Sequence, residues 1–104
     1  MKRTEVQLEK LLSIHSAEPK EEMKENWNEI PPIKIFKIPE QHILKKHFDA
    51  DYLIADGMKR YATAKKYHLK LKAIIIEEKD EHYKEDLEIT MNLARNYYGD
   101  YINW

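Results

Sequence analysis

The residues best placed to do chemistry stand around Gly57, where a short apolar run ends and a helical pattern begins. A helix that starts there leaves the amides of Met58, Lys59 and Arg60 without helical partners, and its aligned dipoles make that end positive. Lys59 and Arg60 add full charges, and a guanidinium offers a bidentate fork for phosphate oxygens. The pattern predicts an anion site. The alternative is that Asp56 or Gly57 only caps the helix, in which case a carboxylate would occupy the same amides.

The strands and helices that must position the turn at Gly57 can be predicted from the hydrophobic pattern. Short apolar, β-branched runs predict strands, and apolar residues at helical spacing predict helices. These patterns alternate along the chain, which indicates an α/β (α+β) class: a single compact domain with a small mixed β-sheet flanked by helices. The expected strands cover residues 33–38, 52–55 and 71–76, and the expected helices cover 40–48, 58–67 and 83–98.

Two segments near the chain start have less regular patterns. A helix is expected over 19–30, because proline is tolerated in a first turn and Met23, Trp27 and Ile30 form one apolar stripe. Pro31-Pro32 would end it. Residues 4–12 fit either a strand or a helix, because the spacing of their apolar residues is compatible with both.

Composition limits the possible functions. The chain of 104 residues has the length of one domain and contains no cysteine, which excludes disulfides, thiolate metal sites and cysteine nucleophiles. Its two glycines cannot form a Walker loop or a dinucleotide fingerprint, and its five histidines show no zinc spacing, so we expect no metal site. The chain start lacks the unbroken apolar stretch of a secretory signal. We therefore expect a cytoplasmic protein without a membrane span.

Charge is sorted along the chain. Residues 33–76 carry 10 basic and 4 acidic side chains, whereas residues 77–104 carry 3 basic and 8 acidic ones. A positive centre suits an anionic ligand, but the acidic end opposes wrapping of duplex DNA. The last nine residues, 96–104, also hold four aromatic residues, which either pack over the domain itself or bind a protein partner. These candidate partner-binding residues are Tyr97, Tyr98, Tyr101 and Trp104.

The stretch Gly57-Met-Lys-Arg60-Tyr61-Ala-Thr-Ala64 resembles the Gly-x-x-Arg helix start of the ParB/sulfiredoxin-like superfamily. Upstream, Ile30-Pro-Pro-Ile-Lys-Ile35 resembles the superfamily's Pro-Pro-Ile-x-Val strand, and residues 65–76 resemble its helix end and next strand. Residues 6–12 then resemble its first strand and following turn, which favours a strand for the opening segment. The resemblance covers about residues 6–77 and leaves an acidic, aromatic helix over 80–104 outside it.

The resemblance implies a ParB/sulfiredoxin-like domain over residues 1–104 that binds a nucleotide, such as ATP or CTP with magnesium. Arg60 would grip phosphate while Gly57 allows close approach. Two departures matter: Met58 stands where sulfiredoxins have their cysteine, and the loop at 13–18 lacks the arginine of ParB proteins. The expected nucleotide- or phosphate-binding residues are Gly57, Met58, Lys59, Arg60 and Tyr61, with Lys20 or Lys24 from the preceding helix adding charge.

Two functions follow as hypotheses. The first is a nucleotide- or phosphate-binding domain that uses the Gly-x-x-Arg helix start. The second is a catalytically inactive, stand-alone interaction module, an accessory or inhibitor protein that binds its partner through the acidic aromatic helix. Neither names a catalytic base or nucleophile. The chain lacks the helix-turn-helix reader of partition proteins, so we do not expect sequence-specific DNA binding.

Overall fold

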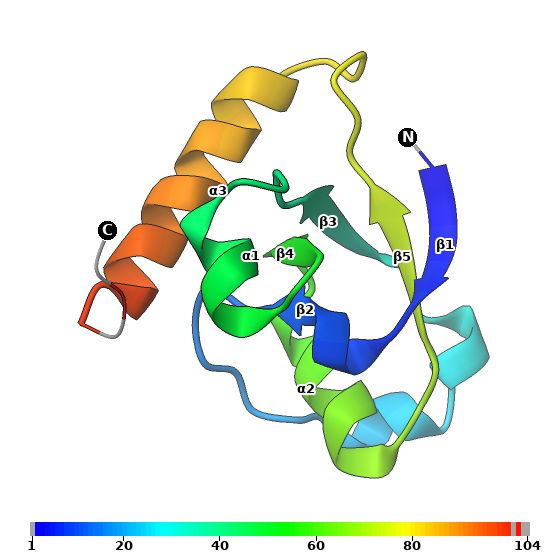
Figure 1. Ribbon diagram of the computed structural model, residues 1–104. Coiled ribbons are helices and arrows are strands. Elements are labelled where there is room, and N and C mark those ends of the chain that lie inside the picture. The colour runs from blue at the N-terminus through cyan, green and yellow to red at the C-terminus, as the bar shows by residue number, and fades with distance from the viewer. Residues whose placement is uncertain (1, 101, 103–104) are drawn as a thin grey trace.

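Five strands form one mixed sheet in the order β1-β5-β3-β4-β2, in a computed structural model that describes residues 2–100 and 102 (Figure 1). β1 is antiparallel to β5, β5 is parallel to β3, β3 is antiparallel to β4, and β4 is parallel to β2. The three strands expected over 33–38, 52–55 and 71–76 are confirmed. The strands span Lys2–Val6 (β1), Leu11–Leu12 (β2), Ile33–Lys37 (β3), Tyr52–Asp56 (β4) and Leu71–Ile75 (β5).

The central strands β3 and β4 bury residues on both of their faces. Successive residues of a strand point to opposite faces, yet Ile35 and Phe36 are both buried, as are Leu53 and Ile54. β1 differs, since its burial alternates between exposed and half-buried positions. The core therefore lies around β3 and β4, and β1 is the exposed edge of the sheet.

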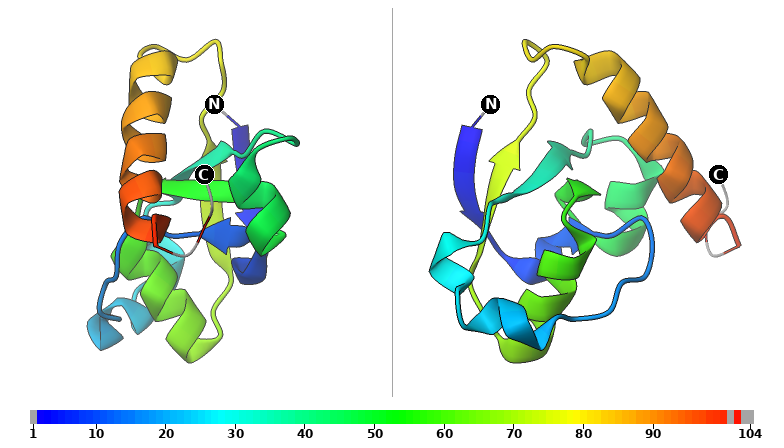
Figure 2. Two further views of the ribbon diagram at one scale, coloured as in Figure 1. Left: turned by 60° about the vertical axis from the view of Figure 1, so that its left-hand side comes forward. Right: turned by 180° about the vertical axis from the view of Figure 1, so that it is seen from behind.

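Three α-helices surround the sheet, and all three were expected from the sequence. They span Ile43–Phe48 (α1), Met58–Tyr67 (α2) and Tyr83–Tyr98 (α3). α2 packs against β3 and β5, whereas α3 contacts β4. Figure 2 shows α3 standing along one side of the sheet, away from α2. The loop from β2 toward α2 passes between these two helices, so it can take contacts from both.

The prediction of a helix over residues 19–30 is wrong. The segment forms two 3-10 turns instead, η2 at Glu21–Lys24 and η3 at Trp27–Glu29. The apolar stripe does not face one surface: Met23 contacts the Thr63 hydroxyl of α2, whereas the Trp27 indole donates to the Lys70 carbonyl before β5, at 2.7 Å. Anchors on two separate elements favour two short turns over one straight helix.

The opening segment forms a strand followed by one helical turn. Lys2–Val6 is a strand, as the resemblance favoured, although it starts before residue 6. It is followed by a 3-10 turn at Leu8–Lys10 (η1) and by the short strand β2. β2 pairs with β4, so the chain crosses to the opposite edge of the sheet within a few residues.

The result is one compact α+β domain with a mixed five-stranded sheet and three helices, as its sequence predicts. Its core is a single cluster that reaches from Leu11 in β2 to Ala94 in α3 and Ile102 beyond it. Across the described residues, no helix combines the length and apolar character that crossing a membrane requires.

Candidate functional site

Gly57 makes the sharp turn from β4 into α2. Its φ is +117°, a region that residues with a side chain rarely adopt, and its backbone is buried against the fully buried Ile33. A Cβ at this position would overlap the Ile33 side chain. The turn therefore requires glycine both for its conformation and for the space beside β3.

The first turn of α2 has free amides. The Tyr61 amide is the first to bond within the helix, to the Gly57 carbonyl at 2.9 Å. The N-cap residue, Gly57, has no side chain that could cap the helix, and the Asp56 carboxylate lies beside the Arg60 guanidinium instead. The first turn also contains no acidic residue. This end of α2 keeps the positive potential of an unneutralised helix start.

Arg60 is already engaged, in contrast to its expected role. Its Nη1 donates to the carbonyls of Pro31 and Pro32, both at 2.9 Å, and its Nη2 lies 3.5 Å from an Asp56 carboxylate oxygen. Only 18% of the side chain is exposed. The guanidinium therefore ties α2 to the segment that enters β3, and little of it is left to grip a phosphate.

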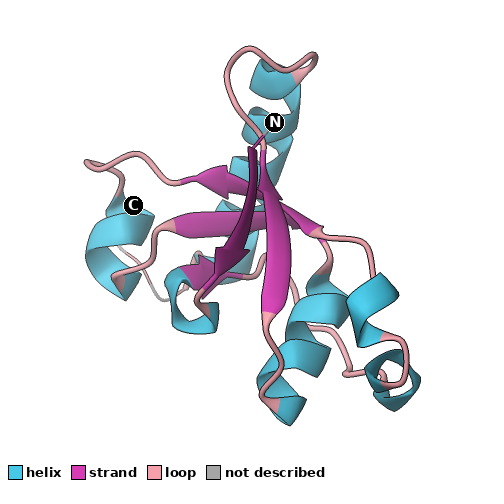
Figure 3. Ribbon diagram, turned by 90° about the vertical axis from the view of Figure 1, so that its right-hand side faces the viewer, coloured by secondary structure: helices cyan, strands magenta, loops and turns pink. Residues whose placement is uncertain are grey.

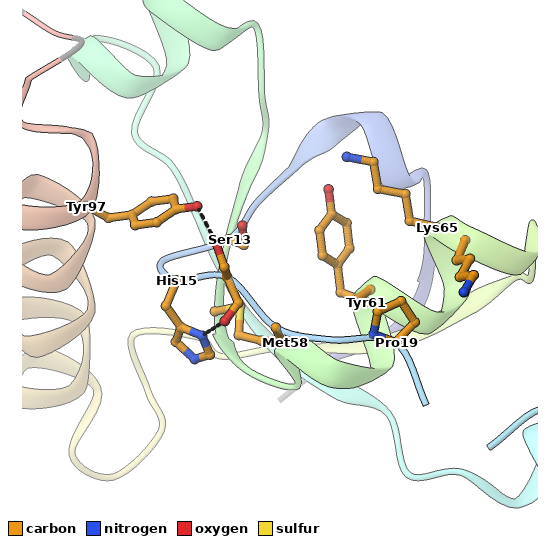
Figure 4. A pocket seen from close by; sticks show the side chains of 11 residues that line it. Ser13, His15, Pro19, Met58, Tyr61, Lys65 and Tyr97 are labelled. Carbon is orange, nitrogen blue, oxygen red and sulfur yellow. Dashed lines mark hydrogen bonds between the residues drawn. The ribbon is translucent and has the colours of Figure 1, made fainter. Parts of the chain in front are cut away.

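A hollow of about 420 Å³ lies between α2 and the loop that follows β2 (Figure 4). Figure 4 shows Lys65 and Tyr61 on the helix side and His15 and Tyr97 on the other. Tyr97 contacts this loop, because its hydroxyl lies 3.2 Å from the exposed Ser16 hydroxyl. No carboxylate is among the described residues that line it. They are Ser13, His15, Ser16, Ala17, Pro19, Met58, Tyr61, Ala62, Lys65, Lys66 and Tyr97.

A second hollow of about 310 Å³ opens at the start of α2 and adjoins the first. The two share His15 and Met58 as lining residues. The exposed Lys59 lines the second hollow, and Asp56 is its one acidic lining residue in the described chain. Together the two hollows form a groove along α2, from its free amides to Lys65 and Lys66.

The structure brings some of the predicted site residues together and separates others. Residues 57–61 all lie along the groove. The two lysines expected from the preceding helix do not join them: the Lys20 amide donates to the Thr63 hydroxyl at 2.8 Å, and the Lys24 ammonium lies 4.2 Å from the centre of the Tyr67 ring, at the far end of α2. Neither lysine lines either hollow.

Sequence reasoning missed the groove's second basic group and its opposite wall. Lys65 and Lys66 follow Met58, Tyr61 and Ala62 at helical spacing, so a helical wheel of α2 could have found them. The residues of the opposite wall, 13–19, carry no such signal. Their position depends on β2 pairing with β4, a contact between distant parts of the chain.

The aromatic tail divides between the domain and the solvent. Tyr98 packs on its own domain: its hydroxyl donates to the Ser13 carbonyl at 2.6 Å, its ring lies 4.8 Å from that of Phe48, and burial raises its pKa. Tyr97 is 40% exposed. Tyr101 and Trp104 lie outside the described residues.

The aspartates that flank β4 are paired with cations. Lys45 binds Asp51 at 2.5 Å, a hydrogen bond that raises the pKa of Lys45 and lowers that of Asp51. Lys10 contacts Asp49 at 3.3 Å. Among the described side chains, no three histidine or carboxylate groups converge as metal ligands would.

A scan against protein-family models found no match, and searches of curated proteins and of solved structures found no similar protein. The likeness to the ParB/sulfiredoxin-like superfamily rests on the sequence motifs alone.

Proposed function

We propose that this chain binds a small phosphorylated ligand of nucleotide size in the groove along α2. The observation that carries the proposal is a pair of adjoining hollows that join an uncapped helix start to three exposed lysines, Lys59, Lys65 and Lys66. Phosphate groups accept hydrogen bonds from free helix amides and gain from nearby positive charge. The ParB/sulfiredoxin-like motif around Gly57 supports the same ligand class, with ATP or CTP and magnesium as first candidates.

The parts of the groove suit different parts of such a ligand. The amides at the start of α2 and the Lys59 ammonium would bind phosphate. Tyr61 and Ala17, which line the larger hollow, offer apolar surface for a base or another ring. In this arrangement Arg60 is a positioning residue, because its bonds to Pro31 and Pro32 fix the helix start. The proposal is for binding and assigns no reaction.

Thermal unfolding with added ligand tests the proposal. ATP, CTP and GTP, each with magnesium, and tripolyphosphate alone are added over a concentration series. A ligand at one hundred times its Kd should add about 2.7 kcal/mol to the free energy of unfolding and raise the Tm. Tripolyphosphate separates recognition of phosphate from recognition of the base. If none of the four raises the Tm at millimolar concentration, the proposal is wrong.

Paired lysine variants locate the effect. Lys65→Ala/Lys66→Ala should remove most of the Tm rise, since both residues line the larger hollow. Lys70→Ala/Lys72→Ala removes the same charge from exposed positions outside the groove and serves as the control. Equal losses in the two double variants would indicate nonspecific attraction to positive charge.

A second function is favoured by a separate observation on α3. Three apolar residues spaced four apart stay exposed on it: Ile89 at 59%, Leu93 at 45% and Tyr97 at 40%. Such a stripe on a surface helix is typical of a docking face. The exposed carboxylates of Glu85 and Glu88 lie on the same helix. We propose as the alternative that α3 binds a protein segment with apolar anchors flanked by lysine or arginine.

A synthetic amphipathic peptide of leucine and lysine tests this alternative. It should bind the full chain, and binding should weaken as salt rises, because the acidic helix contributes charge attraction. Leu93→Glu should abolish binding, whereas Lys84→Gln, an exposed change on the opposite face of the same helix, alters the net charge by the same amount and should leave the apolar stripe intact. If both variants bind equally well, the peptide does not use the stripe.

A further inference from the structure

β1 presents an open strand edge. Lys2–Val6 pairs with β5 on one side only, because β1 is the first strand in the sheet order. Figure 3 shows β1 in front of the sheet, with no described helix or loop drawn across it. Its other side thus carries backbone amides and carbonyls that no neighbouring strand satisfies. Such an edge is a template for a further strand.

The side chains of this edge are arranged so that the strand complements itself. A two-fold axis perpendicular to the sheet places one residue opposite its own copy, which makes Arg3, Thr4 and Glu5 the three central choices. Centred on Arg3 or on Glu5, the pairing would oppose like charges. Centred on Thr4, it places Arg3 opposite Glu5 of the second copy, twice, and pairs threonine with threonine.

The strand on the inner side extends this charge pattern. Within one chain, Glu5 lies opposite Lys72 of β5 in the antiparallel register. Arg3, Glu5 and Lys72 are all exposed. In the pairing centred on Thr4, each Glu5 would stand between Lys72 of its own chain and Arg3 of the other. Charged residues on an edge strand usually oppose association, but here they disfavour only the two other symmetric registers.

We propose that β1 is a self-association edge, on which a second copy of this chain adds its own β1 antiparallel with Thr4 at the centre. The two sheets would then form one continuous ten-stranded sheet, five strands from each copy. A pairing of two five-residue strands buries less surface than a standard stable interface. The dimer should therefore be weak, dependent on protein concentration, and more dissociated at high salt.

A single introduced cysteine tests the register directly, because the natural chain has none. Residues directly opposite in antiparallel strands have Cα atoms about 4.5–5.5 Å apart, within the range of a disulfide. Under mild oxidation Thr4→Cys should give a covalent dimer. Lys2→Cys, on the same face two residues away, should crosslink far more slowly, because its own copy is displaced along the strand. Equal rates for both variants would contradict the Thr4-centred register.

Charge reversal tests the same pairing without a covalent bond. Arg3→Glu places glutamates opposite Glu5 and should weaken dimerisation by about tenfold in sedimentation equilibrium. The double variant Arg3→Glu/Glu5→Arg restores opposite charges across the two-fold axis and should recover the dimer. Circular dichroism checks that each variant is folded. A chain that stays monomeric at all concentrations, with no excess crosslinking of Thr4→Cys, overturns the proposal.

Discussion

The starts of α2 and α3 solve the same physical problem in different ways. Every helix start is positive, because its first amides have no helical partners. α3 neutralises its own start with two carboxylates in the first turn, Glu85 and Asp86. α2 begins at Gly57 with no acidic residue in its first turn, and Lys59 adds a further cation.

The start of α3 is thus neutralised by its own side chains, whereas the start of α2 is suited to bind an external anion. α3 has no electrostatic need for a ligand at its start, and its exposed apolar stripe lies further along the helix. At α2, free amides, exposed lysines and two hollows occur together. The two proposed functions thus centre on different helices. Tyr97 belongs to both sites, so variants at Lys65 and Lys66 on α2 and at Leu93 on α3 test them separately.

Adding one methyl group at the start of α2 should have the largest effect. Gly57→Ala forces a side chain into a φ of +117° and against the buried Ile33. We expect a loss of about 2–4 kcal/mol in the free energy of unfolding, from backbone strain and overpacking together. Urea denaturation measures it. Asparagine tolerates positive φ better than alanine. Gly57→Asn should nevertheless not rescue stability, and a rescue would show that contact with Ile33 is unimportant.

Two neighbouring cations in the first turn of α2 should separate folding from binding. Arg60→Ala leaves the carbonyls of Pro31 and Pro32 without their donor and should cost about 1–3 kcal/mol of stability. Lys59→Ala should change stability by less than about 0.5 kcal/mol, since the residue is exposed. In the presence of tripolyphosphate the order reverses: Lys59→Ala should lose more of the ligand-induced Tm rise. If Arg60→Ala were as stable as wild type, its structural role would be refuted.

The two adjacent tyrosines at the end of α3 should contribute differently to stability, because their hydroxyls have different surroundings. The Tyr98 hydroxyl donates to the Ser13 carbonyl in a half-buried site, so Tyr98→Phe should cost about 1 kcal/mol. The Tyr97 hydroxyl meets an exposed serine, and Tyr97→Phe should cost close to nothing. Thermal denaturation of the two variants compares them. Equal losses would mean that the loop after β2 depends on both contacts.

Much of the fold could be predicted because its signals are local. The inner strands are short runs rich in apolar and β-branched residues, β3 is followed by Pro39 and β4 by Gly57, and α3 has an apolar stripe that ends near Gly99. The turn at Gly57 could be predicted for the same reason, since glycine after a buried strand is a strong signal by itself. These features need no knowledge of how distant segments pack.

The rest depended on contacts between distant residues. Residues 19–30 have a helical pattern, but Met23 and Trp27 are anchored to different elements, and the segment breaks into two turns. Arg60 looks like a phosphate ligand in sequence. Its partners Pro31 and Pro32 become neighbours because β3 pairs with β4, which ends at the start of α2. A sequence pattern gives the type of a side chain, but it does not show which distant residues that side chain contacts in the folded chain.

α1 provides a third kind of helix start, and its small effect can be isolated by pH. The His42 ring accepts a hydrogen bond from the Leu44 amide through Nδ1, at 3.1 Å, and burial lowers the pKa of His42 below its ordinary value of 6.5. Only the neutral ring can accept this bond. The cap's contribution is therefore complete above about pH 6.5 and is lost as the pH falls through the lower pKa of the folded state.

Asparagine caps a helix without titrating, so His42→Asn should lack this loss. The free energies of unfolding of the two proteins should diverge by about 0.5–1 kcal/mol between about pH 7.5 and pH 5, and comparison with the variant cancels the other four histidines. A difference that is constant across this range would mean that the His42 ring does not act as a neutral cap.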